Sequence, residues 1–224
     1  MVDLLAVCAH PDDLEAGLGG MFLKANLEGL CTGLIVFTKG ESGGYTDKET
    51  RVREATEAAK ILQLDYFKLL DFPDAGLYYE KAAVKALIPL LRECAPRYVF
   101  TMLQEDYHPD HVAVSRITEN ACFTAGLKIN SKDNTEWHYE GLLYFSADER
   151  TNRRKPDIYI DISDVAEGKK RMCAAHGSQN ILSLAMSAAE AYGRIAGVRY
   201  AEGLYLRSSF LVHRPMDLFG NHQK

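Results

Sequence analysis

Short apolar runs alternate with amphipathic stretches along most of the 224-residue chain, and this alternation restricts the folds that the chain can adopt. The apolar runs have the length of buried strands, and the stretches between them repeat apolar residues every three to four positions, as amphipathic helices do. We predict strands at Leu4–Cys8, Gly33–Phe37, Phe67–Leu70, Tyr98–Met102, Leu142–Phe145, Ile158–Ile162 and Gly203–Leu206. We predict helices at Met21–Glu28, Lys48–Leu62, Lys81–Glu93, Val112–Ala125, Ser163–Ala175 and Ser183–Ile195.

Strands and helices that alternate in this way form βαβ units on a mostly parallel sheet. Because the crossovers are right-handed, the helices cover both faces of the sheet. We therefore predict a single α/β domain over residues 1–224, with a doubly wound sheet of strand order 3-2-1-4-5. The polar segments Lys128–Glu140 and Ser146–Pro156 are predicted loops, of a length often found in lids and binding loops.

Charge and cysteine usage restrict the cellular setting and the partners. The formal net charge of −5 gives no strongly basic overall surface, so we expect no nucleic-acid partner. The cysteine count of five is odd and no CxxC pair occurs, which favours reduced thiols in a cytoplasmic protein. The first apolar run, Val2–Ala9, contains Asp3 and is too short for a signal peptide or a membrane span. We expect no membrane partner; the assembly state stays open, a homo-oligomer included.

Histidine, aspartate and glycine concentrate in two segments, Ala9–Gly20 and Glu105–His111. Each contains His-Pro-Asp, and each follows a predicted parallel strand. With strand order 3-2-1-4-5, the first and fourth strands are neighbours across the switch point, where ligands bind in the crevice beyond the carboxyl ends of the strands. The two segments are therefore predicted to face each other.

The residue types in these segments fit a catalytic metal site. Imidazole and carboxylate ligands suit zinc, and a catalytic zinc keeps three protein ligands and a water molecule. We predict one divalent metal per chain, zinc first, held by His10, Asp13 and His111. The metal would lower the pKa of its water toward about 7 and polarise a carbonyl group. Asp12, adjacent to a ligand but not used as one, is the predicted general base.

A second pair of residues is predicted to assist the leaving group. If Pro109 opens a helix, His108 lies one turn from His111. As an imidazolium, His108 could stabilise the oxyanion and protonate the leaving amine, while a hydrogen bond from Asp110 would keep it charged and oriented.

The segments AHPDDLEAGLGG and HPDH resemble the two signature motifs of the PIG-L/LmbE superfamily of N-acetylglucosaminyl deacetylases. The resemblance extends over nearly the whole chain, through Thr38–Glu41, Arg51–Glu54, Phe72–Asp74, Pro156–Ser163, His176–Gln179 and Tyr200–Gly203. It implies a Rossmann-like fold, a divalent metal held by His10, Asp13 and His111, Asp12 as the base, His108 near the oxyanion and Arg51 contacting an N-acetylated amino sugar. In some members a tyrosine stands two residues before the first histidine of HPDH; here that position is Asp106.

Within the superfamily, the segment order is most similar to that of bacillithiol-pathway deacetylases, which act on N-acetylglucosaminyl malate. The resemblance thus implies a substrate with two carboxylates, which need cationic partners. The loop cations Arg150, Arg153, Arg154 and Lys155 are candidates, with Arg153 and Arg154 as the first choice and Arg51 and Glu41 as further substrate-binding residues. The plainer interpretation is that these charged residues are solvated.

Other interpretations remain at this stage. The aspartates of the first motif could cap a helix, and the two histidines of the second could lie on the surface. The glycines at 17, 19 and 20 suggest dinucleotide binding, but Phe22 stands where GxGxxG needs its last glycine. Two histidines and one aspartate are also the ligands of iron oxygenases, although those with an HxD motif normally have jelly-roll folds. A sugar-binding module without catalysis would need the ligands but not Asp12.

Overall fold

The computed structural model describes residues 1–44, 46–127, 137–148 and 154–207. Its strands are β1 (Leu4–Cys8), β2 (Thr32–Thr38), β3 (Tyr66–Phe72), β4 (Tyr98–Met102), β5 (Gly141–Phe145), β6 (Ile158–Asp161) and β7 (Ala201–Leu206). Its helices are α1 (Asp13–Gly17), α2 (Gly19–Leu27), α3 (Lys48–Leu62), α4 (Lys81–Cys94), α5 (Pro109–Ala125), α6 (Ala166–Ala175) and α7 (Leu182–Ala196). The predicted alternation is confirmed, with the short helix α1 as an addition.

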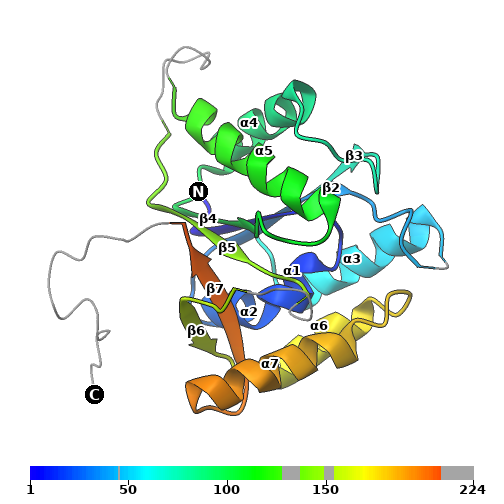
Figure 1. Ribbon diagram of the computed structural model, residues 1–224, viewed down its shortest axis with the longest axis vertical. Helices are drawn as coiled ribbons and strands as arrows, with labels where there is room; N and C mark the ends of the chain where they lie inside the picture. Colours follow the sequence, from blue (N-terminus) through cyan, green and yellow to red (C-terminus); the bar gives the residue numbers. More distant parts are fainter. Residues whose placement is uncertain (45, 128–136, 149–153, 208–224) are drawn as a thin grey trace, which may run out of the picture.

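The strands form one sheet of order β3-β2-β1-β4-β5-β7-β6 (Figure 1). The first five are parallel, so the predicted order 3-2-1-4-5 is confirmed. Strand β7 lies between β5 and β6 and runs antiparallel to both. A sequence pattern shows that a segment is a strand but not which neighbour it pairs with, so the last two positions were not predicted.

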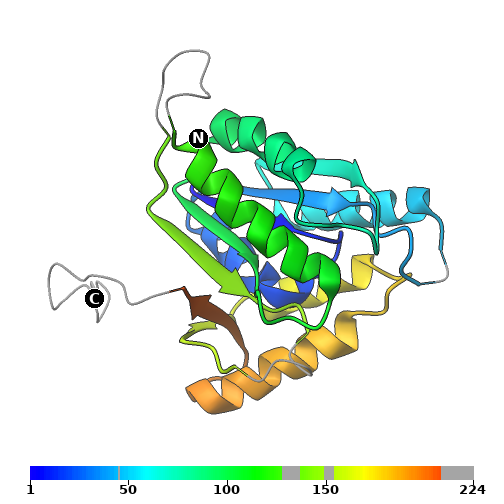
Figure 2. The same cartoon turned by 45° about the horizontal axis from the view of Figure 1, so that its top comes forward.

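Helices cover both faces of this sheet, as predicted. Helices α4 and α5 pack together on one face, and α2, α3 and α6 lie on the other, with α7 beside β6 and β7 (Figures 1 and 2). Coverage on both sides explains why β2 is buried along its whole length and reads as an apolar run rather than an alternating one. The fold is therefore a single α/β domain.

The central strands bring the two motif segments to one edge. β1 and β4 are parallel neighbours, with Val7 opposite Thr101. The hydroxyl group of Thr101 donates to the Val7 carbonyl at 3.0 Å, which adds a side-chain bond to the strand pair. The turns after Cys8 and Met102 consequently leave the sheet side by side.

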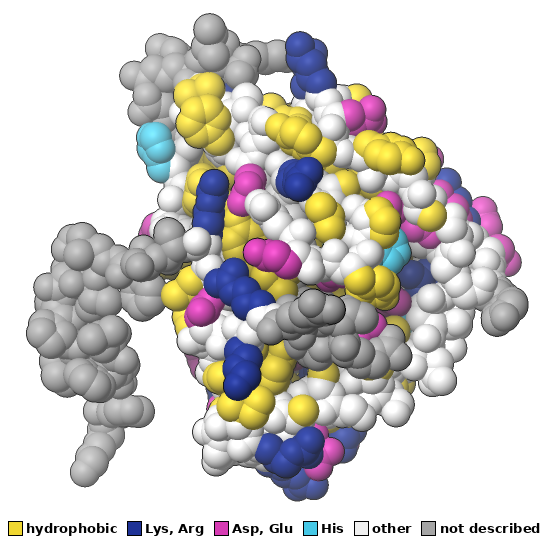
Figure 3. Space-filling view, in the orientation of Figure 1, with side chains coloured by type: hydrophobic (Ala, Val, Ile, Leu, Met, Phe, Trp, Pro, Cys, Tyr) yellow, Lys and Arg dark blue, Asp and Glu magenta, His cyan; other side chains and the backbone are white. Residues whose placement is uncertain are grey.

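The distribution of charged side chains on the described surface fits the formal net charge of −5 (Figure 3). In the view of Figure 3, Lys and Arg side chains of the described residues are interspersed with acidic and apolar ones. No helix in the described part of the chain has the length and apolarity that crossing a bilayer requires. All five cysteines are free thiols, and Cys31 is the exposed one.

Candidate active site

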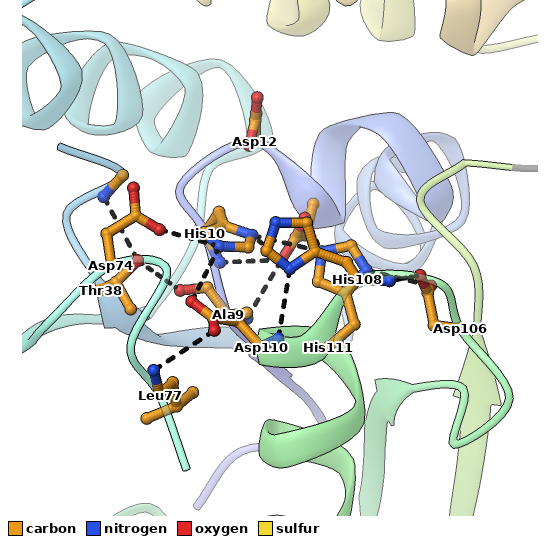
Figure 4. Close-up of polar contacts among 12 residues, drawn as sticks. Ala9, His10, Asp12, Thr38, Asp74, Leu77, Asp106, His108, Asp110 and His111 are labelled. Carbon is orange, nitrogen blue, oxygen red and sulfur yellow. Dashed lines mark hydrogen bonds and ion pairs between the residues drawn. The ribbon is translucent and has the colours of Figure 1, made fainter. Parts of the chain in front are cut away.

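The three predicted metal ligands lie close together at the carboxyl ends of β1 and β4, and Figure 4 shows two of them, His10 and His111. His10 lies in the turn after β1, Asp13 begins α1, and His111 lies in the first turn of α5. Nδ1 of His10 is 3.2 Å from Nε2 of His111, and Oδ1 of Asp13 is 3.1 Å from the same nitrogen. All three side chains are buried. Nε2 of His111 thus lies close to both a nitrogen of His10 and a carboxylate oxygen of Asp13.

Backbone amides fix the Asp13 carboxylate. Its Oδ2 accepts hydrogen bonds from the backbone N–H groups of Ala9 and His10, at 3.1 and 2.8 Å. The other oxygen, Oδ1, is left to face His111. The tight turn between β1 and α1 therefore places the carboxylate before any metal binds.

Carboxylates also lie against the outer nitrogen of each histidine. His111 Nδ1 is 3.0 Å from Oδ2 of Asp106. His10 Nε2 is 3.1 Å from Oδ1 of Asp74, which is ion-pair distance although the geometry is not that of a hydrogen bond. Such carboxylate–histidine pairs fix the ring orientation and raise the basicity of the nitrogen that faces the metal. Sequence reasoning assigned no role to Asp74 or Asp106, although both stand in quoted motifs.

The charge balance of this cluster fits a cation. Burial lowers the pKa of His10, but Asp13, Asp110 and Asp74 outweigh it and raise that pKa to about 12. Burial likewise lowers the pKa of His111, and Asp13 and Asp106 raise it to about 9. Without a metal the carboxylates therefore draw protons onto two imidazole nitrogens that lie 3.2 Å apart. A divalent ion would supply this positive charge without two protons that face each other.

His108 is a further candidate ligand. One nitrogen each of His10, His108 and His111 lie within 4.8 Å of one another. However, Nδ1 of His108 already accepts a hydrogen bond from the Asp110 backbone N–H at 3.2 Å. We keep Asp13 as the third ligand because it is charged and directly faces His111.

Asp12 differs from its neighbour Asp13. It occupies the N-cap position of α1, but its side chain makes no capping hydrogen bond. Its carboxylate instead faces the guanidinium of Arg51, with both N–O distances at 3.4 Å. The helix-capping interpretation therefore does not hold for Asp12, which lines the cavity beside the ligands.

Arg51 is buried against Asp12 rather than solvated. It lies in the first turn of α3, whose N-cap Asp47 accepts a hydrogen bond from the Thr50 backbone. Gly40, with φ of +67°, allows its approach, because a Cβ there would lie 2.5 Å from Nη2 of Arg51. Arg51 also lines the cavity, so contact with a ligand and alignment of Asp12 are both within its reach.

The hydrogen bond predicted between the Asp110 side chain and His108 is wrong, because other groups bind that side chain. The Asp110 carboxylate accepts from the backbone N–H groups of Ala75 and Leu77, and Oδ2 is 3.5 Å from Nε2 of His10. Only the backbone N–H of Asp110 reaches His108. Burial, with the nearby His10 and His111, holds the pKa of His108 below its usual value. Because Nδ1 accepts the hydrogen bond from Asp110, the geometry favours a ring with its proton on Nε2 over the predicted imidazolium. Helix α5 begins at Pro109, three residues before the predicted Val112, so the condition that placed His108 one turn from His111 is met.

The other predicted substrate residues lie elsewhere or cannot be placed. Oε1 of Glu41 accepts from the Asp74 backbone at 3.1 Å, so Glu41 holds the loop that carries Asp74. Arg154 binds Asp157 and the Leu206 carbonyl and lines a different cavity. Arg153 lies outside the described residues. Of the predicted substrate-binding residues that the structure describes, Arg51 is the one that lines the cavity beside the predicted ligands.

That cavity has a volume of about 360 Å³, in the range of small-molecule sites. Beyond the ligands and Asp12, it is lined by Ser42, Gly43, Tyr107, Asp148, Gln179, Ile181 and Leu184. The lining combines polar side chains with small and branched apolar ones. Gln179 stands in the quoted segment His176–Gln179, but its place in the cavity was not predicted.

The glycines of the first motif serve packing instead of phosphate binding. A Cβ at Gly17 would lie 2.4 Å from the Phe145 ring. At the start of α2, the backbone N–H groups of Gly20 and Met21 donate to the buried carboxylate of Glu202, at 2.8 and 2.7 Å. The helix N-terminus that would hold a pyrophosphate is therefore already occupied.

Comparison with known proteins identifies the family. The model of the GlcNAc-PI de-N-acetylase family, PIG-L, matches residues 5–122, which include every residue of both motifs. The chain belongs to the PIG-L family. It is similar to the diacetylchitobiose deacetylase of Thermococcus kodakarensis, at 30% identity over 94% of this chain and 85% of that protein.

Solved structures share the PIG-L architecture over most of their length. The conserved protein TT1542 of Thermus thermophilus is 33% identical, with a TM-score of 0.87 over 96% of this chain and 98% of that one. The 4-carboxy-2-hydroxymuconate hydratase GalB of Pseudomonas putida gives a TM-score of 0.84 at 20% identity, over 96% and 99% of the two chains. The second likeness shows the fold alone, so the reaction must be argued from the site.

Proposed function

We propose that this chain is a metal-dependent hydrolase that removes the N-acetyl group from an N-acetylglucosamine-type sugar. One observation carries the proposal: a three-atom ligand set of His10, Asp13 and His111 shares a cavity with a carboxylate, Asp12, that is spent on neither the metal nor a helix cap. The PIG-L match and the similarity to a diacetylchitobiose deacetylase support the substrate class.

When bound, a divalent metal supplies a Lewis acid that polarises the amide carbonyl and makes water a nucleophile near neutral pH. Asp12 accepts the proton of the attacking water, and Arg51 aligns its two oxygen atoms. The water oxygen bonds to the carbonyl carbon, the carbon–nitrogen bond breaks, and Asp12 returns the proton to the amine. The products are acetate and a free amino sugar.

His108 takes a different part from the predicted one. Because Nδ1 accepts the Asp110 backbone N–H, the neutral ring carries its proton on Nε2. We propose that this Nε2–H donates to the oxyanion that develops on the acetyl oxygen. A preorganised donor of this kind in a site shielded from water typically contributes roughly two to three orders of magnitude in rate.

The aglycone is the finer part of the proposal. Sequence resemblance points to a malate conjugate, whereas the similar archaeal enzyme is named for diacetylchitobiose. Arg154 lies outside the cavity. Among the predicted cations that the structure describes, Arg51 is the one that could bind a substrate carboxylate there.

The test is incubation of the purified protein with N-acetylglucosamine, diacetylchitobiose and N-acetylglucosaminyl malate, scored for free amine and acetate. We expect equal amounts of the two products and loss of both with a chelator. Oxygen uptake would indicate the iron oxygenase instead, which the α/β fold already disfavours. Binding without product would indicate a sugar-binding module.

A further inference from the structure

Residues 176–181 connect α6 to α7 along one side of the cavity, and Gln179 and Ile181 of this segment line it. We infer that Gln179 is a specificity-determining residue, whose side-chain oxygen accepts a hydrogen bond from a hydroxyl group of the sugar. The inference rests on the proposed sugar substrate and assigns a contact to a residue to which the sequence analysis gave no role.

The orientation of the Gln179 amide follows from its partners. Nε2 lies 3.2 Å from the Gly43 carbonyl oxygen and 3.2 Å from the Ser178 hydroxyl oxygen. A carbonyl oxygen can only accept, so the nitrogen must face Gly43. Both N–H groups are then used within the protein. Among the described residues, no donor reaches Oε1, which remains as an acceptor for a ligand.

Two anchors hold the segment in place. The backbone N–H and the hydroxyl group of Ser178 both donate to the Glu54 carboxylate on α3, at 2.8 and 2.6 Å. His176 is fully buried and its Nε2 lies 3.5 Å from Oε1 of Glu15 on α1. Gln179 is thus fixed relative to the helices that carry Arg51 and Asp13, which removes much of the entropy cost of binding through it.

The loop after β2 leaves room for the Gln179 amide because it has a glycine at the point of contact. Gly44 has φ of +77°, and a Cβ there would lie 2.5 Å from Nε2 of Gln179. The Gln179 amide therefore joins two walls of the cavity, the loop at Gly43 and the segment before α7. An acceptor held at such a junction selects a ligand that carries a donor at that point.

The test compares Gln179→Met, which keeps the length but removes the acceptor, with Gln104→Met, the same change outside this cavity. With N-acetylglucosamine we expect Gln179→Met to raise KM about three- to tenfold, the scale of one neutral hydrogen bond, with kcat within about twofold. Gln104→Met should leave both constants unchanged. Gln179→Asn, which keeps the amide but shortens it, should give the same result and serves if the methionine variant does not fold.

Deoxy sugars identify the donor. For the wild-type protein, KM should rise by the same factor with one of the 3-, 4- or 6-deoxy analogues. In Gln179→Met, that analogue and N-acetylglucosamine should have the same KM. Glu54→Ala should raise KM by the same factor, and it should add little to the effect of Gln179→Met in the double variant. Glu54→Gln keeps an acceptor for Ser178 and should leave KM near the wild-type value.

Binding separates this inference from the proposed function. The dissociation constant of N-acetylglucosamine is measured calorimetrically on the chelated protein, where no hydrolysis occurs. Wild-type binding that weakens in Gln179→Met supports the inference even if no product ever forms, in which case the proposed function alone fails. An unchanged KM and dissociation constant in both Gln179 variants would overturn the inference while deacetylation stands. Absence of both binding and hydrolysis in the wild-type protein would overturn both.

Discussion

The two adjacent aspartates of the first motif are proposed to differ in role because their side chains have different partners. The Asp13 carboxylate is held by two backbone N–H groups and faces His111, which is the position of a ligand. The Asp12 carboxylate faces Arg51 and the cavity, which is the position of a base. The sequence pattern predicted this division but not its cause, because side-chain direction within a tight turn is set by tertiary contacts.

Asp12→Asn should separate the two roles. The amide cannot accept the proton of water, so we expect kcat to fall by roughly a hundredfold or more, the scale of a lost general base. The metal content and the melting temperature should stay near those of the wild-type protein. Metal analysis together with steady-state rates provides the check, and loss of the metal from Asp12→Asn would mean that the two aspartates are reversed.

Asp106 should tune metal affinity through His111. Asp106→Asn replaces the anionic partner of Nδ1 with a neutral one, and such changes typically weaken metal binding by roughly 10- to 100-fold. Competition with a chromophoric chelator measures the affinity. Asp71→Asn, at an exposed carboxylate that pairs with surface lysines, is the matched control. Equal affinities in the two variants would exclude Asp106 from the site.

At the scale of elements, short segments around the motifs were the hardest to predict. The periodicity predicted α3 with its bounds and α5 except for its first turn, whereas α1 is five residues long and shows no helical period. Sequence spacing placed Asp110 near His108, but two backbone N–H groups of the turn before α4 donate to the Asp110 carboxylate. A hydrogen bond from a segment distant in sequence cannot be predicted from a local pattern.

The packing of α1 makes a prediction about stability. A Cβ at Gly17 would lie 2.4 Å from the Phe145 ring and 2.8 Å from the Ser146 carbonyl. Gly17→Ala should therefore destabilise the fold by roughly 1–3 kcal/mol, as overpacking does. Urea unfolding measures this, with Gly177→Ala as the control because its added Cβ would meet a single atom at 3.7 Å. Equal unfolding midpoints would show that α1 can shift freely.

At the scale of the whole molecule, strand order brings two distant motifs to one edge of the sheet. The alternation of strands and helices was the basis for predicting that order, so the proximity of His10, Asp13 and His111 could be predicted before any distance was known. The roles of Asp74, Gln179 and Glu54 could not be predicted, although all three stand in quoted segments, because their partners lie far away in the sequence. Their contribution depends on how the layers pack.

The buried charge of the site predicts a pH dependence of the metal-free protein. The pKa values of His10 and His111 are raised to about 12 and about 9, above the usual 6.5. Below about pH 6.5 their contribution to stability is complete; above it, the unfolded chain loses its protons first and stability declines as pH approaches 9. The melting temperature of chelated protein should therefore fall from pH 6.5 to 9.

Metal affinity should change in the opposite direction. Because zinc must displace these protons, its affinity should rise over the same pH range. Calorimetry in buffers of different ionisation enthalpy should show proton release on binding. A binding enthalpy independent of the buffer at pH 7.5 would contradict protonated ligands in the metal-free site.

The central claim is that one metal ion, held by His10, Asp13 and His111, enables hydrolysis of an acetamido sugar in this cavity. The most direct measurement titrates zinc into chelated protein while acetate release from the responsive N-acetylglucosaminide is followed. The account predicts a rate that rises to a plateau at one zinc per chain, and no metal uptake or acetate release by His10→Ala, Asp13→Ala or His111→Ala. Full activity of the chelated protein, or full metal content in these three variants, would contradict it.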